Sequence, residues 1–251
     1  MSQRSLFAVV AAALAVTAGP LAARPAPGAC AFGVAPTVLL DDGDPHAKNG
    51  KRLEMWEVAD APIWWSAVHP DGAYGDFRAK VAARVPETRP IPLLRQVPQA
   101  NNQVILDHAR QWIHPANCLE MLLIARQYAR IDLLEQPTEF AAVVLRSPDG
   151  RRLRIYNYTI NQDGIGRATP ISEPAARDHR GGWAILGFLH NHNFHPGDPL
   201  TNGPLAPSVP DANFNLNFAR EAGLAEAWIT NGLNTVRIPA AAFPAFEHEG
   251  G

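Results

Sequence analysis

Cysteine is scarce in this sequence: Cys30 and Cys118 are the two present among 251 residues. An even pair in an oxidising compartment forms a disulfide more often than a metal-binding or catalytic pair, so we expect one bridge between them. Such a bridge requires the two Cα atoms to lie within about 7 Å of each other. The alternative for Cys30 is a lipid-modified N-terminus, although the leucine that begins a lipobox is missing from the residues before it.

An excess of charge of one sign is also missing. The chain has 22 Lys and Arg against 24 Asp and Glu, and its basic residues are scattered. Nucleic-acid binding needs a basic stripe or patch, and attraction to a membrane surface needs a polybasic segment. The sequence therefore argues against both kinds of partner.

One apolar run stands out, and it is too short to span a bilayer comfortably. Residues 6–18 are almost entirely apolar and follow the cationic Arg4, and candidate cleavage points come after Gly19 and Ala23. This layout is typical of a secretory signal peptide, here residues 1–23. We expect an exported protein, periplasmic or secreted, with no stable membrane insertion after signal removal. An uncleaved N-terminal anchor is the alternative.

Internal repeats and low-complexity tracts are absent, and the remaining roughly 220 residues are enough to bury a substantial core. Residues 24–100 are rich in proline and glycine and show no sustained helical or alternating period. We treat them as an N-terminal extension of unknown role. They form either a small accessory lobe or a wrap across the following domain, with Trp56, Trp64 and Trp65 as buried contacts.

From residue 101 the signals for regular structure sharpen. Asn117 with Glu120 is a candidate capping box for one helix, and Ser208 opens another that stops at Gly223. The polar stretch between the second and third strands is expected to be a loop. The expected helices cover 104–113, 118–130 and 208–222, and the expected strands cover 139–145, 153–160, 183–189, 225–230 and 235–238. This order predicts an α/β fold in which helices sandwich a mixed sheet.

The candidate metal ligands begin at the end of the expected strand 183–189, which is followed directly by His190, Asn191 and His192. Residues two apart at a strand end point to the same side, so both imidazoles can reach one metal ion. Asp211 lies in the first turn of the next helix, where the helix dipole keeps its carboxylate ionised and able to bind a cation. Such a set leaves a fourth tetrahedral position open, which is typical of catalytic zinc. The alternative for the histidines is two surface side chains at a strand end. Ser208 and Asp211 also have the spacing of a capping box, which is compatible with metal binding by Asp211.

The segments GFLHNH and PSVPDANF, followed by a helix and a short hairpin, resemble the JAMM (MPN+) metalloprotease motif H-x-H…S-x-x-D, and Glu139 in PTEFAAVVL stands where that family has its upstream glutamate. The resemblance covers roughly residues 135–240 and is closest to bacterial JAB-like domains. It implies a JAB/MPN-like, cytidine-deaminase-like fold for residues 101–251.

The same resemblance implies roles for the matched residues. His190, His192 and Asp211 would bind Zn²⁺, Glu139 would be the general base for the water that zinc activates, and Ser208 would donate a hydrogen bond to the oxyanion. The implied activity is hydrolysis of amide or isopeptide bonds in a peptide or protein substrate.

The sequence also departs from the family motif. The spacer 193–207 is about twice as long as the family has, and it contains His195 and Asp198, which are alternative ligands or neighbours of the ligands. Three other hypotheses stay open: a JAMM-like binding module without turnover, a metallo-β-lactamase-like hydrolase using H-x-H-x-x-H (His190, His192 and His195), and a purely structural secreted domain. Phe194 stands where the second of these needs aspartate.

Overall fold

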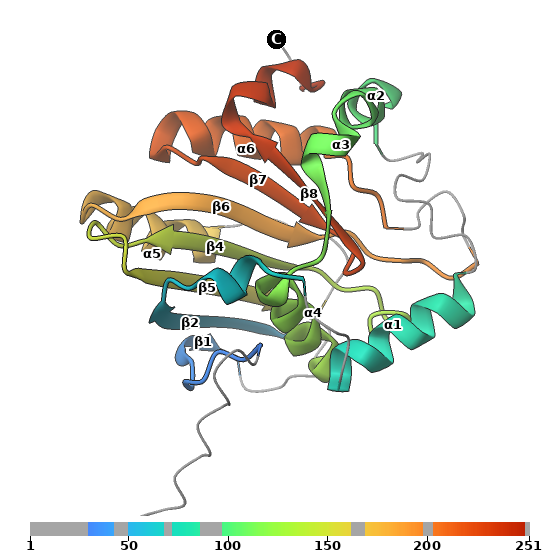
Figure 1. The fold of residues 1–251 in the computed structure, drawn as a ribbon, viewed down its shortest axis with the longest axis horizontal. Coiled ribbons are helices and arrows are strands. Elements are labelled where there is room, and N and C mark those ends of the chain that lie inside the picture. Colours follow the sequence, from blue (N-terminus) through green and yellow to red (C-terminus); the bar gives the residue numbers. More distant parts are fainter. Residues whose placement is uncertain are drawn as a thin grey trace, which may run out of the picture.

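The computed structural model describes residues 30–42, 50–67, 72–85, 97–161, 169–197 and 203–248. The predicted signal peptide, residues 1–23, lies outside these ranges. Within them, the protein is built around one eight-stranded mixed sheet (Figure 1). The predicted α/β class with a mixed sheet is therefore confirmed.

The strand order across the sheet is β1-β2-β5-β4-β6-β7-β8-β3. The pair β6–β7 is parallel, and the other pairs are antiparallel. The strands are β1 (Thr37–Asp41), β2 (Lys51–Ala59), β3 (Ile113–Pro115), β4 (Phe140–Arg146), β5 (Arg152–Ile160), β6 (Ala184–Asn191), β7 (Glu226–Thr230) and β8 (Asn234–Pro239).

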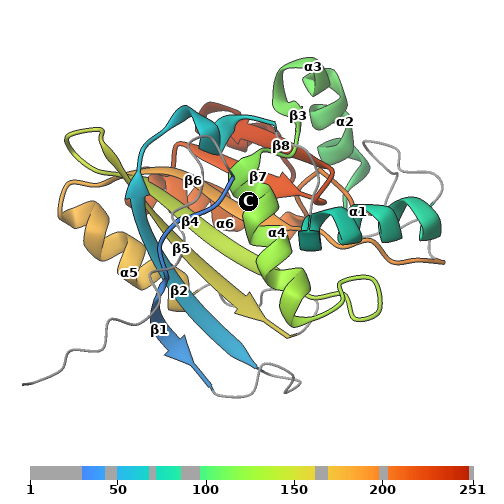
Figure 2. The ribbon, with the colours of Figure 1, turned by 60° about the horizontal axis from the view of Figure 1, so that its bottom comes forward.

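Helices cover both faces of this sheet (Figures 1 and 2). The α-helices are α1 (Gly72–Arg84), α2 (Gln99–Asp107), α3 (Ala109–Trp112), α4 (Cys118–Arg130), α5 (Thr169–Arg180) and α6 (Val209–Ala222). Two 3-10 helices, η1 (Pro62–Trp65) and η2 (Ala240–Ala245), complete the described elements. Among the described residues, no helix combines the length and the hydropathy needed to cross a bilayer.

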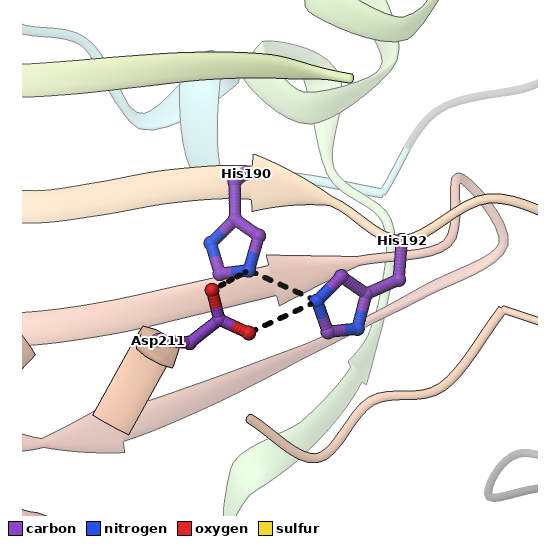
Figure 3. A group of neighbouring side chains, drawn as sticks. All are labelled: His190, His192 and Asp211. Carbon is purple, nitrogen blue, oxygen red and sulfur yellow. Dashed lines mark hydrogen bonds and ion pairs between the residues drawn. The ribbon is translucent and has the colours of Figure 1, made fainter. Parts of the chain in front are cut away.

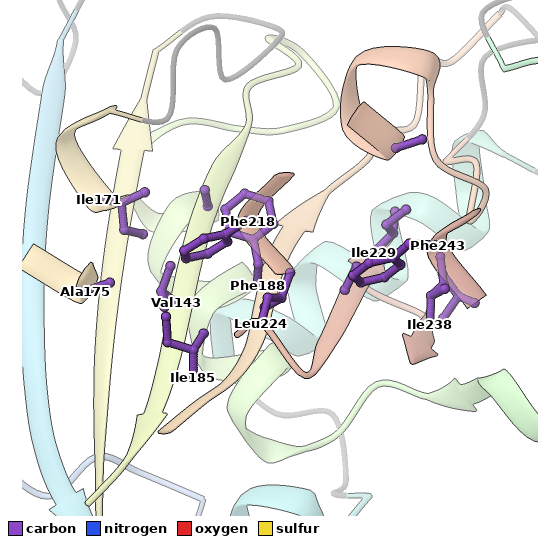
Figure 4. Packing of buried hydrophobic residues seen from close by; sticks show 14 of the residues in the cluster. Val143, Ile171, Ala175, Ile185, Phe188, Phe218, Leu224, Ile229, Ile238 and Phe243 are labelled. Carbon is purple, nitrogen blue, oxygen red and sulfur yellow. The ribbon is translucent and has the colours of Figure 1, made fainter. Parts of the chain in front are cut away.

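The central strand β4 shows why the core has two parts. Its residues from Phe140 to Leu145 are all buried, because the apolar run FAAVVL fills both faces. Ala141 and Val143 join a cluster with α5 and α6, whereas Ala142 and Val144 join a cluster with α1 and α4. Figure 4 shows the first cluster, in which Val143 lies near aromatic side chains of β6 and α6. Fully burying each large aliphatic side chain stabilises the fold by about 1.5–3 kcal/mol.

The described part of residues 24–100 belongs to this same sheet. The strand β2 pairs with β5 along all nine of its residues, from Lys51↔Ile160 to Ala59↔Arg152. Trp56 is 2% exposed and Trp64 is 5% exposed, so both side chains are part of the core. The helix α1 packs on α4. These residues therefore extend the sheet and cover one of its faces.

The predicted disulfide between Cys30 and Cys118 is confirmed, with the Cα atoms 5.6 Å apart. It ties the N-terminal segment to the first residue of α4. Because the bridge uses the Sγ atom of Cys30, a lipid thioether at that residue is excluded in this structure.

Two local expectations were wrong. Residues 104–113 were expected to form one helix, but the helical segment starts at Gln99 and is interrupted at His108, and Ile113 begins β3. Pairing of Ile113 with Val236 of β8 overrides the local helical pattern. The polar stretch after β5, expected as a loop, contains α5, which packs on β4 and β5.

Candidate metal centre

The strand β6 brings the two histidines to one edge of the sheet. His190 pairs with Ala141 of β4 and with Ile229 of β7. The ladder continues past the strand end, because the backbone N–H of His192 donates to the carbonyl of Thr230 at 2.8 Å. The backbone is therefore still extended at His192, and both imidazoles lie on the side of the sheet that α6 covers.

Asp211 reaches the same place from the first turn of α6. Ser208 is the N-cap of this helix, and its Oγ accepts a hydrogen bond from the Asp211 N–H at 3.3 Å. In return, Asp211 Oδ2 accepts hydrogen bonds from Ser208 N at 2.9 Å and from Ser208 Oγ at 2.6 Å. The predicted capping box is confirmed, and it fixes the Asp211 carboxylate facing β6.

The three side chains converge, as Figure 3 shows. His190 Nε2 and His192 Nε2 lie 3.1 Å apart, His190 Nε2 lies 3.6 Å from Asp211 Oδ1, and His192 Nε2 lies 3.4 Å from Asp211 Oδ2. Tetrahedral zinc with bonds of about 2.0–2.1 Å places its ligand atoms about 3.3–3.4 Å from one another. Each imidazole nitrogen therefore lies near this spacing from the carboxylate oxygen that it faces, and one ligand atom from each of the three residues lies within 4.8 Å of the others, so the group can hold a metal ion.

A backbone carbonyl selects the tautomer of His192. Its Nδ1 lies 2.9 Å from the carbonyl oxygen of Pro204, and a carbonyl can only accept, so Nδ1 carries a proton. In the neutral ring the lone pair is then on Nε2, which faces the Asp211 carboxylate. Two acceptors in contact repel each other unless a proton or a cation lies between them, so this arrangement suits a metal ligand.

The segment that supplies this carbonyl is itself fixed by buried asparagines. Asn231 Nδ2 donates to the Gly203 carbonyl, and Asn101 Nδ2 donates to the Pro207 carbonyl, both at 3.0 Å. Asn101 is fully buried and Asn231 is 3% exposed. Buried hydrogen bonds of this kind hold residues 203–207, and with them Pro204, against His192.

Charge interactions within the group shift two pKa values. Burial raises the pKa of Asp211, but the charges and hydrogen bonds of His190 and His192 outweigh it and hold the pKa well below 3.8. Burial also lowers the pKa of His192, yet the Asp211 carboxylate outweighs it and the net pKa is raised. The Asp211 carboxylate thus favours a positive charge at His192.

Asn191, between the two histidines, points to the opposite face and connects β6 to the start of β4. Its Oδ1 accepts from the Phe140 N–H at 2.7 Å, and its Nδ2 donates to the Thr138 carbonyl at 3.1 Å and to Asn193 Oδ1 at 2.9 Å. These bonds fix the segment that carries both histidines. This anchoring role of Asn191 was not predicted from the sequence.

Glu139 lies directly before β4, next to the histidine pair. Because Ala141 is opposite His190, continuing the antiparallel register places Glu139 opposite His192 and on the same face. Its side chain is half-buried, and its carboxylate contributes to the raised pKa of His192. Glu139 does not belong to the three-residue group that can hold a metal.

The remaining predicted residues have different positions. The Ser208 hydroxyl donates to Asp211, so in this structure its proton is not directed at an oxyanion. Among the described residues, His195 is not part of the metal-competent group. Asp198 lies outside the described residues. The Pro204 carbonyl had no sequence signal, because a backbone contact across the loop leaves no side-chain signature.

Comparison with known proteins adds nothing to this geometry: no protein-family model, no curated protein and no solved structure shows significant similarity to the chain.

Proposed function

We propose that this protein is an exported zinc-dependent hydrolase with a JAMM-like catalytic domain, which cleaves amide or isopeptide bonds in a peptide or protein substrate. One observation carries the proposal. Two imidazole nitrogens and a carboxylate lie at ligand spacing, and a fourth ionisable residue, Glu139, lies beside them without belonging to the ligand group. A purely structural zinc site would use a fourth protein ligand instead.

The donor set supports zinc as the metal. Imidazole nitrogen is a ligand for zinc, copper, iron and nickel, whereas oxygen-rich sites suit magnesium, calcium and manganese. A His₂–carboxylate set with an open position is typical of catalytic zinc. When bound, zinc supplies a Lewis acid that lowers the pKa of a coordinated water to about 7.

Each of the chain's own residues has a part in this proposal. His190, His192 and Asp211 hold the ion, and the Ser208 cap leaves Asp211 Oδ1 without the two hydrogen bonds that Oδ2 receives. Glu139 accepts a proton from the attacking water and delivers it to the leaving amine nitrogen. Ser208 stabilises the oxyanion once its hydroxyl turns from Asp211 towards the substrate.

The three candidate ligand side chains are largely buried, which suits a reaction that is screened from bulk water. The side chain of His190 is 2% exposed, that of His192 is 10% exposed, and that of Asp211 is 25% exposed. Asp211 is the most exposed of the three, so we propose that a substrate approaches the site from the side of Asp211. A substrate that covers this side would exclude water and strengthen every electrostatic interaction beneath it.

Export is proposed from two independent features. Residues 1–23 have the composition of a signal peptide. The disulfide between Cys30 and Cys118 suits an oxidising compartment. In such a compartment the available amide substrates are envelope peptides and extracellular proteins.

The test separates the base from the ligands. Glu139→Gln keeps the shape but removes the basic carboxylate, so zinc content should stay near that of the wild type while turnover of an envelope-peptide library falls by about 10² to 10⁴. His192→Ala should lose both zinc and activity. Glu135→Gln is the matched control, since Glu135 is an exposed glutamate that pairs with Arg84.

Two results would count against the proposal. An unchanged rate in Glu139→Gln would remove Glu139 from the mechanism. A wild type that binds zinc and cleaves none of the peptides would favour the binding-module hypothesis instead.

A further inference from the structure

The second nitrogen of His190 has an unmet hydrogen-bonding need. Nε2 faces Asp211 and His192, so Nδ1 carries the proton when His190 is a ligand. Nδ1 is buried and has no hydrogen-bond partner among the described residues. In Figure 3 this nitrogen lies on the side of the ring away from His192. Metal-binding histidines almost always donate this N–H to a carboxylate, a carbonyl or a water.

A complementary acceptor lies on α6. Asn215 follows Asp211 by four residues, so the two side chains lie on one face of the helix with Cβ atoms about 5–6 Å apart. Asn215 is 2% exposed, and its Oδ1 is buried without a partner among the described residues. A buried amide oxygen without a donor is costly, so this atom also calls for a partner.

The packing of α6 on β6 brings these two atoms to the same region. Asp211 meets His190, and one turn later Phe214 contacts Phe188, with ring centroids 4.6 Å apart. Phe188 in turn lies 5.7 Å from the His190 ring. Phe218 also contacts Phe188, with ring centroids 6.3 Å apart, so Asn215 lies between Asp211 and Phe218 on the face of α6 that contacts β6. It therefore lies beside the segment Phe188–His190.

We propose that Asn215 is a positioning residue for His190. Its Oδ1 accepts, through one buried water, the hydrogen bond that His190 Nδ1–H donates. The water is part of the proposal because both atoms are buried and neither has a hydrogen-bond partner among the described residues. The link fixes the tautomer that leaves Nε2 free for the metal, holds the ring orientation and makes Nε2 a stronger ligand.

This inference rests on the metal-binding part of the proposed function and is independent of hydrolysis.

The chain offers a control for Asn215. Asn157 on β5 is also fully buried and has side-chain atoms without a hydrogen-bond partner among the described residues. Asn157 pairs with Ala142 and Glu54 and lies on the opposite face of the sheet from the metal centre. It is therefore the matched control for any effect of simply removing a buried amide.

The experiment measures the zinc dissociation constant by competition with a chromogenic chelator, on the full chain with its disulfide intact. Asn215→Leu should bind zinc about 10- to 100-fold more weakly than the wild type, the usual effect of removing such a partner. Asn157→Leu should stay within about threefold of the wild type. Asn215→Asp keeps the acceptor and should bind at least as tightly as the wild type.

Cobalt provides a readout that a loss of packing would not produce. The visible spectrum of the Co²⁺-loaded protein reports ligand geometry, so it should change in Asn215→Leu and not in Asn157→Leu. An Asn215→Leu affinity within about threefold of the wild type would overturn the inference. If that variant does not fold, Asn215→Asp decides, and an affinity more than about tenfold weaker than the wild type would equally overturn it.

Failure of the hydrolase proposal would look different. The wild type would then bind zinc and cleave nothing, while the zinc affinities of the two Asn215 variants would still separate as expected.

Discussion

Two capping boxes in this protein place an acid in the first turn of a helix, and the two acids have different partners. Asn117 and Glu120 begin α4, and Ser208 and Asp211 begin α6. Both boxes have the same reciprocal hydrogen bonds between N-cap and N3. Locally, the two helix starts are equivalent.

The tertiary partners of the two acids differ in kind. Glu120 is 1% exposed, and its oxygens accept from Thr235 Oγ1 at 2.8 Å and from Arg237 at 2.9 Å. Asp211 instead faces two imidazoles, which are uncharged unless they take up a proton. The first acid has a permanent cation, and the second has ligands that can share a metal ion with it.

The same capping box therefore has a structural role at α4 and a proposed metal-binding role at α6. The Arg237 guanidinium lies beside Glu120 as a permanent cation, so that site has no need of an external ion. Around Asp211 the positive charge must come from a bound metal or from protons. The function therefore follows from what packs against the cap, and the cap sequence alone does not decide it.

The largest expected effect comes from removing each acid in turn. Asp211→Ala should weaken zinc binding by about 10³-fold, since one of three ligands of a site worth roughly 10–16 kcal/mol is lost. Glu120→Ala should leave zinc affinity unchanged but lower the free energy of unfolding by about 3 kcal/mol or more, because Arg237 loses its buried partner. Chelator competition and urea denaturation measure the two quantities. Equal effects of both variants on zinc would break the comparison.

The disulfide tests the structural side of the same comparison. It joins Cys30 to the first residue of α4, with a sequence separation of 88 residues. The chain-entropy argument gives a loss of about 4.6 kcal/mol in the free energy of unfolding for the Cys30→Ser, Cys118→Ser double variant. Zinc affinity should not change, since the bridge belongs to the hydrophobic cluster on the opposite face of the sheet from α6 and the metal centre. A large loss of zinc binding would contradict the separation of the two sites.

A smaller effect is expected at the caps themselves. Ser208→Ala and Asn117→Ala should each lower the free energy of unfolding by about 1 kcal/mol. Only Ser208→Ala should also slow peptide turnover, by about 10²-fold, if its hydroxyl stabilises the oxyanion as proposed. Thermal unfolding and turnover on the same samples check this. A Ser208→Ala variant with a normal rate would reduce Ser208 to the role of a cap.

Local signals in the sequence were enough for the elements that carry the metal centre. Caps, turns and apolar runs predicted α4, β4, β5, β6 and α6 to within one or two residues. The convergence of His190, His192 and Asp211 was also predictable, because a strand end and a helix start each fix one side-chain direction. What local signals could not supply is the Pro204 carbonyl that orients His192, since that contact depends on the path of a long loop.

Other elements were hidden because tertiary contacts oppose their local pattern. Pro174 stands inside α5 and suggests a loop, yet Ile171 and Ala175 are fully buried in the core, which holds the helix in place. In β2 the alternation is masked by Glu54, a charged residue that is 1% exposed because Arg126 pairs with it. A charged residue in the sequence predicts a solvent-exposed position, because the distant partner that allows it to be buried cannot be identified from the sequence.

The smallest expected effect is a difference in pH dependence between the metal-free and zinc-loaded proteins. The pKa of His192 is raised in the folded protein, so its contribution to stability is fully present below its ordinary value of 6.5 and is lost as pH rises through the folded pKa. The pKa of Asp211 is lowered, so its contribution is lost only as pH falls below 3.8 towards the folded pKa.

In the window that begins at pH 6.5 and extends upward through the folded pKa of His192, the free energy of unfolding of the metal-free protein should therefore decrease as His192 loses its proton. Zinc needs the neutral imidazole, so zinc affinity and the stability it adds should increase over the same window. Urea denaturation at several pH values, with excess chelator or excess zinc, measures both slopes. Asp211→Asn removes the carboxylate that raises the pKa of His192, so the decrease in the metal-free protein should become smaller in that variant. A metal-free protein that grows more stable across this window would show that no proton replaces the metal between Asp211 and His192.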